Sequence, residues 1–276
     1  MSRLSCEICP RRCQLAPGEI GFCRARQNQN GRVVALNYGK VSSVALDPIE
    51  KKPLTRFYPG NFILSVGGFG CNLRCSFCQN HEISQVAATA PGAVTSPETL
   101  VKLAVDLSAR PPGNLGVAFT YNEPFVNYEF VLDTAKLIRK ANLKTILVTN
   151  GIINEKPLNE LLPYIDAANI DLKAFDADFY RWIGGNFETV KRTIELAAKK
   201  LHIEITNLII PGKNDSETEV EALASWLAKL SEEIPLHITR YFPRYKLQIP
   251  ATDPATVFRL TEIARKHLRY VYAGNC

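Results

Sequence analysis

Long apolar runs are missing from this 276-residue chain. No stretch reaches the roughly 20 residues that a membrane-spanning helix needs, and the N-terminus has no apolar core of the kind found in secretory signals. The chain also lacks internal repeats and low-complexity segments. With 46% hydrophobic and 22% charged residues, its composition is that of a globular protein, and we expect no membrane partner.

A strong excess of one charge is missing as well. The 33 basic residues outnumber the 27 acidic ones by only six, and they are dispersed along the chain. Proteins that bind nucleic acids gather more basic residues on one face. We therefore expect a solvated, mildly basic surface and no nucleic-acid partner.

Cysteines, in contrast, are present and unevenly placed. Seven of the eight fall into a group of four and a group of three: Cys6, Cys9, Cys13 and Cys23, and Cys71, Cys75 and Cys78. Without a secretory signal, metal ligation is a better expectation than a disulfide framework. Thiolate metal sites are sensitive to oxygen, which favours a cytoplasmic location. The eighth, Cys276, has no obvious partner.

The group of three has the spacing C-x3-C-x2-C in a glycine-rich loop that follows an apolar strand. Three thiolates at this spacing can bind three corners of a 4Fe–4S cubane. Electron-transfer clusters take four cysteines, so one iron here would stay open to a ligand from outside the chain. The alternatives are a zinc site and simple packing of the loop.

The group of four supplies enough thiolates for a complete second site. Either a tetrahedral zinc or a fully ligated 4Fe–4S cluster would satisfy these cysteines, and free thiols are the remaining alternative. Such a site would relay an electron, or would pin a segment whose core is too small to fold alone.

The distribution of cysteines and apolar runs divides the chain into two regions. Residues 1–60 form a Cys-rich N-terminal extension, with a β-hairpin expected from 33–36 and 41–46. In residues 61–276, strands alternate with helical stripes, which predicts parallel strands joined by right-handed crossovers in an α/β fold. The expected strands are 63–66, 115–119, 145–148, 167–172, 203–210 and 236–239.

The cysteine triplet, with the aromatic Phe77 before its last member, resembles the C-x3-C-x-aromatic-C motif of the radical S-adenosylmethionine (SAM) superfamily. This resemblance implies an open partial TIM barrel of about six β/α units. It also implies a 4Fe–4S cluster whose open iron binds SAM. Reductive cleavage of SAM would then give a 5′-deoxyadenosyl radical that abstracts hydrogen from a substrate. No catalytic side chain beyond the cluster ligands is expected.

The ends of the predicted strands carry polar residues, as sites in parallel α/β folds do. The resemblance makes six of them SAM contacts: Asn122, Glu123, Asn150, Asp171, Lys173 and His237. Glu123 would match the acidic residue that binds the SAM amino group. A turn before Pro124, a local Asp171–Lys173 ion pair and a buried core role for His237 are the structural alternatives.

Further segments resemble one family more closely, the radical SAM protein of the AmmeMemoRadiSam system, which is related to glycyl-radical activases. They are Cys6–Cys13, Gly21–Arg24, Asp47–Leu54, Phe57–Gly60, Cys78–Asn80 and Thr120–Pro124. The chain departs from that family at Phe242, where a histidine is common, and at Cys276, where a Cys-x-x-Cys tail is common.

The closer resemblance implies a protein or other macromolecular substrate and an electron from reduced flavodoxin or ferredoxin. It also suggests a Memo-like partner. A small-metabolite substrate is the first alternative. A non-catalytic iron–sulfur electron-transfer protein or zinc scaffold is the second.

Overall fold

A parallel sheet forms the centre of the molecule. The computed structural model describes residues 3–89 and 92–276, and within them the strand order is β14-β13-β12-β11-β10-β9-β7-β6. All neighbours pair in parallel except β6 and β7. The strands are β6 (Ser43–Pro48), β7 (Phe62–Gly67), β9 (Gly116–Phe119), β10 (Lys144–Thr149), β11 (Ala167–Asp171), β12 (His202–Ile209), β13 (Leu236–Arg240) and β14 (Val271–Gly274).

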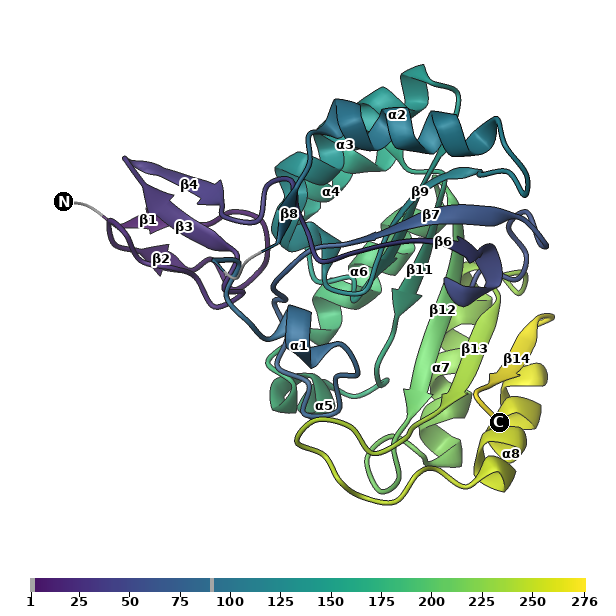
Figure 1. Ribbon diagram of the computed structural model, residues 1–276. Coiled ribbons are helices and arrows are strands. Elements are labelled where there is room, and N and C mark those ends of the chain that lie inside the picture. Colours follow the sequence, from purple (N-terminus) through teal and green to yellow (C-terminus); the bar gives the residue numbers. More distant parts are fainter. Residues whose placement is uncertain (1–2, 90–91) are drawn as a thin grey trace.

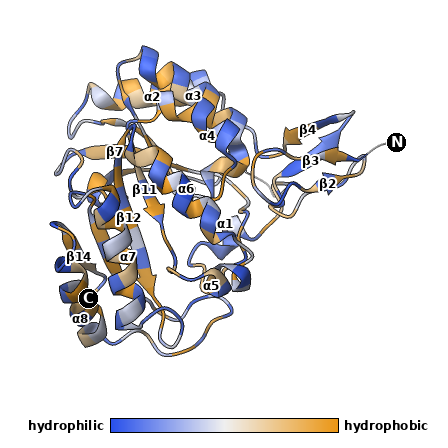
Figure 2. Ribbon diagram, turned by 180° about the vertical axis from the view of Figure 1, so that it is seen from behind, coloured by the Kyte–Doolittle hydropathy of each residue, from blue (hydrophilic) through white to orange (hydrophobic). Residues whose placement is uncertain are grey.

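Helices cover the outer face of this curved sheet (Figure 1). The α-helices of the described residues are α1 (His81–Ser84), α2 (Pro97–Ser108), α3 (Tyr128–Lys140), α4 (Glu155–Leu161), α5 (Ala177–Trp182), α6 (Phe187–Ala198), α7 (Glu217–Leu230) and α8 (Pro254–Arg265). Short 3-10 turns are η1 (Ile49–Lys51), η2 (Pro124–Asn127) and η3 (Leu162–Tyr164), and α1, α5 and η1 lie at the ends of the barrel and not on its outer face (Figure 1). The strands of the sheet are mainly apolar in Figure 2, and blue, hydrophilic residues lie along the helices. Strand–helix alternation from β7 to α8 gives the predicted six units, and β14 adds a last strand.

The ends of the helices follow from local sequence. Ser96 accepts a hydrogen bond from the peptide N–H of Thr99, and Pro97 occupies the first turn of α2, where a missing N–H costs nothing. Ser216 caps α7 in the same way through the N–H of Glu219. The apolar stripes of these helices then pack on the sheet, as their spacing predicts.

The sheet is open, because β14 lies at one edge and β6 at the other. This confirms the predicted partial barrel. Strand β6 belongs to residues before 61, so the predicted boundary between residues 60 and 61 falls inside the sheet. No helix in the described part of the chain is long and apolar enough to span a membrane.

The N-terminal extension projects from the side of the barrel (Figures 1 and 2). It holds two small antiparallel sheets, β1 (Leu4–Ser5) with β2 (Gln14–Leu15) and β3 (Arg26–Gln29) with β4 (Arg32–Ala35). A third small sheet pairs β5 (Lys40–Val41) with β8 (Ala93–Val94).

A hairpin is present, but the predicted pairing of 33–36 with 41–46 is wrong. Strand β4 pairs antiparallel with the preceding strand β3, and Asn30 and Gly31 form the turn between them. Strand β6 pairs with β7 in the main sheet. Asn30 and Gly31 both have positive φ, at 50° and 75°. An Asn-Gly pair favours this tight hairpin turn, which explains why the strands pair across it. The chain also turns at Asn37–Lys40, but the strands on either side of that turn do not pair with each other.

The N-terminal end of the barrel interior is filled by apolar side chains. Ile49 and Leu54 are fully buried there against Ile63, Ala118, Ile146 and Ala167, which begin or lie within four neighbouring strands. The interior therefore has a packed base, and polar residues lie nearer the carboxyl ends of the strands.

Candidate functional site

The cysteine triplet lies in the loop between β7 and α1, beyond the carboxyl end of the first parallel strand. The Cys71 thiol accepts hydrogen bonds from the N–H of Leu73 at 3.4 Å and from Asn150 Nδ2 at 3.6 Å. The Cys78 thiol lies 3.1 Å from Ser84 Oγ. Phe77 is buried and contacts Phe179 and Trp182, which hold the loop against α5.

The three thiols are close enough to affect one another. Burial raises the pKa of Cys75 to about 12, and the neighbouring Lys173 lowers it while Cys78 raises it further. Burial also raises the pKa of Cys71 well above its usual range, and the charges of Glu123, Cys75 and Cys78 add to the effect. A positively charged metal centre bound by the three thiolates would relieve the repulsion between their negative charges. The triplet therefore fits an iron–sulfur cluster.

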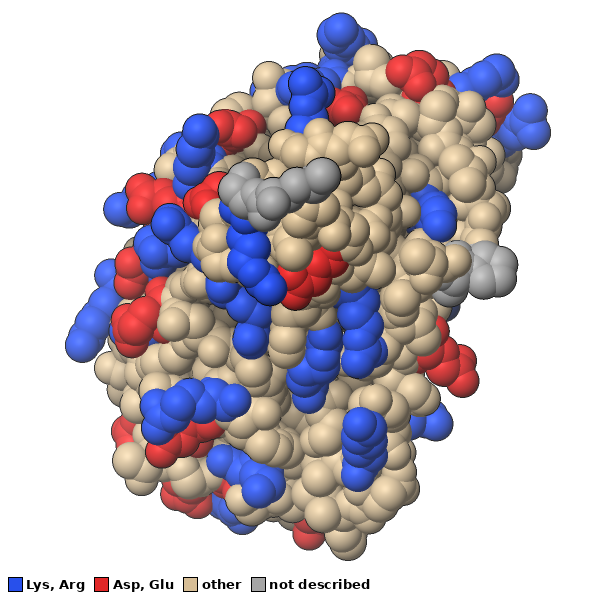
Figure 3. Space-filling model, turned by 90° about the vertical axis from the view of Figure 1, so that its left-hand side faces the viewer, with Lys and Arg blue, Asp and Glu red and all other residues tan. Residues whose placement is uncertain are grey.

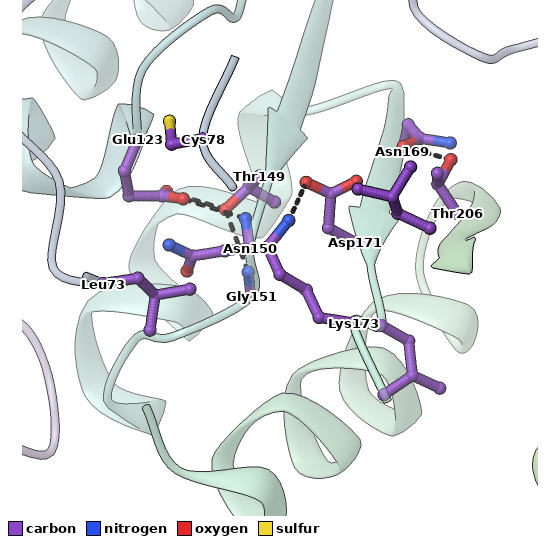
Figure 4. Close-up of polar contacts among 12 residues, drawn as sticks. Leu73, Cys78, Glu123, Thr149, Asn150, Gly151, Asn169, Asp171, Lys173 and Thr206 are labelled. Atoms are coloured by element: carbon purple, nitrogen blue, oxygen red, sulfur yellow. Dashed lines mark hydrogen bonds and ion pairs between the residues drawn. The ribbon is translucent and has the colours of Figure 1, made fainter. Parts of the chain in front are cut away.

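Glu123 lies beneath the loop and is almost fully buried. Its carboxylate accepts a hydrogen bond from Thr149 Oγ1 at 2.7 Å (Figure 4). It also accepts from the N–H of Asn150 at 2.8 Å and from the N–H of Phe125 at 3.0 Å. Burial nevertheless raises its pKa to about 7. Glu123 thus fixes the end of β10, from which Asn150 reaches the Cys71 thiol.

Asp171 and Lys173 form a second polar group at the end of β11. Lys173 Nζ lies 2.8 Å from Asp171 Oδ2, and the lysine side chain is largely buried (Figure 4). Burial lowers the pKa of Lys173, but Asp171 and then Cys75 more than compensate and hold it above its usual range. The pair therefore lies beside the cysteine loop, with the Asp171 carboxylate partly exposed and the Lys173 ammonium group largely buried next to it.

Asn122 has a local role in the structure. Its Oδ1 accepts from the N–H of Gly68 at 2.8 Å, and its Nδ2 donates to the carbonyl of Gly70 at 3.1 Å. Asn122 therefore braces the glycine-rich segment that leads into the triplet.

His237 does not join these residues. It is the second residue of β13, and its Nε2 lies 2.6 Å from Glu204 Oε2. Glu204 also accepts from His202 and from the N–H groups of Thr55 and Arg56. The structure thus places His237 in the buried core role, beside the segment that closes the base of the barrel.

Several polar residues at this edge carried no signal in the sequence. Asn72 donates to the carbonyl of Ile152 and accepts from Asn150 Nδ2 at 2.9 Å, which ties the triplet loop to the end of β10. Inside the barrel, Asp47 binds both Lys52 Nζ at 2.9 Å and Tyr121 Oη at 2.7 Å. Asp47 and Lys52 come from a segment that was identified only by its resemblance.

The N-terminal extension docks on the same edge. Asn154 donates from its N–H to the carbonyl of Ile8 and from Nδ2 to Glu7, and Arg11 Nη2 donates to Gly184. A pocket of about 290 Å³ remains at this contact, lined by Cys9, Arg11, Asn72, Ile152 and Gly185 among others. The extension therefore helps to enclose the space next to the triplet.

The comparisons with known proteins agree with this site. The radical SAM superfamily matches residues 65–227. An uncharacterized protein of Methanocaldococcus jannaschii is 41% identical over 280 residues, which cover 99% of this chain and 82% of that protein. The pyruvate formate-lyase-activating enzyme of Clostridium pasteurianum is 28% identical over 177 residues, which cover 61% of this chain and 72% of that enzyme.

Solved structures share the fold at low sequence identity. SuiB of Streptococcus suis bound to S-adenosylmethionine has a TM-score of 0.59 and 16% identity, covering 75% of this chain and 48% of that one. A domain of the pyruvate-formate lyase-activating enzyme from Bacteroides vulgatus has a TM-score of 0.51 and 21% identity, covering 58% of this chain and 98% of that one. The chain belongs to the radical SAM superfamily, and it is an enzyme that uses a 4Fe–4S cluster and SAM.

Proposed function

We propose that the enzyme is activase-like and abstracts hydrogen from a protein substrate. One observation carries the proposal. The cysteine triplet, Glu123 and the Asp171–Lys173 pair gather at one edge of a chain that is similar to pyruvate formate-lyase-activating enzymes over 61% of its length. A non-catalytic scaffold is set aside, because the superfamily to which the chain belongs consists of enzymes.

Each residue has a role that follows from its position. Cys71, Cys75 and Cys78 would hold the cluster, which when bound supplies the electron for cleavage of SAM into methionine and a 5′-deoxyadenosyl radical. Asn150 donates toward the Cys71 sulfur and is itself held by Glu123. N–H donors to a cluster sulfur tune the cluster's potential. Glu123 therefore positions this part of the site from below.

Asp171 and Lys173 would bind the polar ends of SAM. A carboxylate suits a ribose hydroxyl, and an ammonium group suits a carboxylate, as charge-assisted hydrogen bonds are stronger than neutral ones. Because Lys173 is pinned by Asp171 and lies near Cys75, its charge is held in place before any ligand arrives. This preorganisation reduces the cost of ordering SAM.

We infer that reduced flavodoxin or ferredoxin delivers the electron, and that a Memo-like protein is the first candidate substrate or partner. Lys and Arg side chains gather in the middle of the face that carries the N-terminal end (Figure 3), which would suit an acidic donor. We also infer a cytoplasmic location, since reduced thiols and an oxygen-sensitive cluster need reducing surroundings.

The test uses anaerobically reconstituted protein, SAM and dithionite. Formation of 5′-deoxyadenosine would establish cleavage, and a Cys75→Ala variant is the control without a complete triplet. The candidate protein is then supplied in fully deuterated form. Deuterium in 5′-deoxyadenosine is the expected result. Deuterium transfer only from a labelled small-molecule extract would instead make the substrate a metabolite.

A further inference from the structure

The four N-terminal cysteines come together on two neighbouring turns. The N–H of Cys6 donates to the carbonyl of Cys13 at 3.0 Å and so closes the first turn beyond the β1–β2 pair. The second turn runs from Gly21 to Arg26, joined by the N–H of Gly21 and the carbonyl of Arg26 at 2.8 Å. A β carbon at Gly21 would lie 3.6 Å from the Cys13 sulfur, so the two turns are in contact.

The electrostatics of these thiols agree with this arrangement. Burial raises the pKa of Cys9 to about 11, and the thiolates of Cys23, Cys6 and Cys13 raise it further. Burial and the charges of Cys6 and Cys13 likewise raise the pKa of Cys23. Cys6 and Cys23 are buried and Cys9 and Cys13 are partly buried, so the four cysteines form one group that is largely shielded from solvent.

A buried arginine faces this group. Arg26 is 4% exposed, and its two terminal nitrogens bind Glu129 at 2.8 and 2.6 Å. Its Nε has no oxygen or nitrogen partner, although a buried N–H normally has one. The same guanidinium is a near neighbour of Cys6. The unpartnered donor is thus accounted for if a cluster bound by the cysteines supplies a sulfur acceptor beside it.

The site touches the triplet loop directly. The N–H of Cys71 donates to the carbonyl of Cys23 at 3.3 Å. Arg74, one residue before Cys75, donates to the carbonyl of Phe22, and its guanidinium stacks on the Phe22 ring at 3.9 Å. The two cysteine groups are therefore joined through the backbone and through one side chain.

A single ion fits this group less well than a cluster. Among residues 3–89 and 92–276, no set of three or more His, Cys, Asp or Glu side chains is arranged to hold one metal ion. Zn–S bonds of about 2.3 Å bring the sulfurs of a zinc site within roughly 4 Å of one another. A cubane holds its thiolates at separate corners and so spreads them more widely.

We propose that Cys6, Cys9, Cys13 and Cys23 ligate a second, fully ligated 4Fe–4S cluster adjacent to the first, with Arg26 donating to its sulfur. Complete cysteine ligation leaves this cluster no open iron, so SAM would bind only at the triplet. The proposal concerns the metal content of the chain and holds whether or not the substrate is a protein.

Iron, sulfide and zinc analysis of the reconstituted full chain tests the proposal. The wild type should hold about eight irons. A Cys71→Ala/Cys75→Ala/Cys78→Ala variant should keep about four irons with an EPR spectrum that SAM leaves unchanged. A Cys9→Ser/Cys23→Ser variant should keep about four irons with a spectrum that SAM perturbs. That SAM response also shows that the second variant is folded. A triplet variant without iron, or with one zinc, would overturn the proposal.

Two further measurements test the placement. The reduced wild type should show magnetic interaction between two clusters, and a spectrum equal to the sum of the two variants would contradict their adjacency. In the triplet variant, Arg26→Gln should lower the midpoint potential of the remaining cluster, because a buried positive charge favours the reduced form. Arg3→Gln, an exposed arginine of the same extension, is the matched control and should leave the potential unchanged.

Discussion

Gly70 packs directly on the peptide of Cys23. A β carbon at position 70 would lie 2.7 Å from the Cys23 carbonyl oxygen and 2.8 Å from the Ala25 side chain. Gly70 also has a φ of +86°, a conformation that side chains rarely adopt. The join between the N-terminal extension and the triplet loop therefore depends on the absence of a side chain at this residue.

We expect Gly70→Ala to destabilise the protein more than Gly60→Ala does. Gly60 has a similar φ of +79°, but a β carbon there would meet nothing within 4 Å, so Gly60→Ala carries only the conformational penalty of about 1–2 kcal/mol. Gly70→Ala adds a steric clash with backbone. Chemical denaturation of both variants measures the difference, and equal losses would show that the close approach does not matter.

Cys75→Ala should abolish the SAM-responsive cluster, because two thiolates hold a cubane poorly. Reconstitution followed by EPR with and without SAM is the measurement. Cys276→Ala is the control, since that residue is exposed, and it should behave as the wild type. A SAM-perturbed signal that persists in Cys75→Ala would refute the triplet assignment.

Asp171→Asn should weaken SAM binding while the iron content stays unchanged. Loss of a charge-assisted hydrogen bond costs about 1.5–3 kcal/mol, roughly a tenfold to hundredfold rise in the dissociation constant. Titration of the cluster signal with SAM gives the affinity. Asp178→Asn, an exposed aspartate on α5, is the matched control. If Asp171→Asn binds SAM as tightly as Asp178→Asn and the wild type do, the Asp171–Lys173 pair has only a structural role.

The free energy of unfolding should decrease at acidic pH because Glu204 becomes protonated. Burial alone would raise its pKa, but hydrogen bonds from His202 and His237 hold it at about 2, below its ordinary value of 4.5. A depressed folded-state pKa stabilises the protein above pH 4.5, and this contribution is lost as the pH falls from 4.5 toward 2. The effect is on the order of 3 kcal/mol.

Denaturation of wild type and Glu204→Gln from pH 7 to pH 2 measures this contribution. The variant should be less stable at pH 7, and its stability should change less below pH 4.5. Glu221→Gln, at an exposed glutamate near His267, should follow the wild type. Parallel curves for wild type and Glu204→Gln would rule out this role for Glu204.

Much of the fold was predictable because parallel strands buried on both faces have continuous apolar runs in their sequence. The expected strands at 63–66, 145–148 and 203–210 each lie within one residue of β7, β10 and β12. Strand β14 was missed because it has four residues, two of them Ala273 and Gly274, and no apolar run of its own. The misplaced hairpin shows that the Asn30-Gly31 turn was a stronger signal than the alternation around Gly39.

The site was predictable where its residues stand at the carboxyl ends of strands. Glu123, Asn150 and Asp171 meet there because neighbouring parallel strands end at the same edge. His237 was assigned to that edge although it is the second residue of its strand, and its partner Glu204 is distant in sequence. Pairings of this kind depend on which faces of β12 and β13 turn inward, and periodicity alone does not reveal them.

The filled base of the barrel limits the routes by which molecules can reach the barrel interior. Ile49, Leu54 and the backbone of Thr55 and Arg56, tied to Glu204, form a floor beneath the strands. Anything that enters the barrel interior therefore cannot pass through that floor, and it must come from the side of the cysteine loop or through the open edges of the sheet.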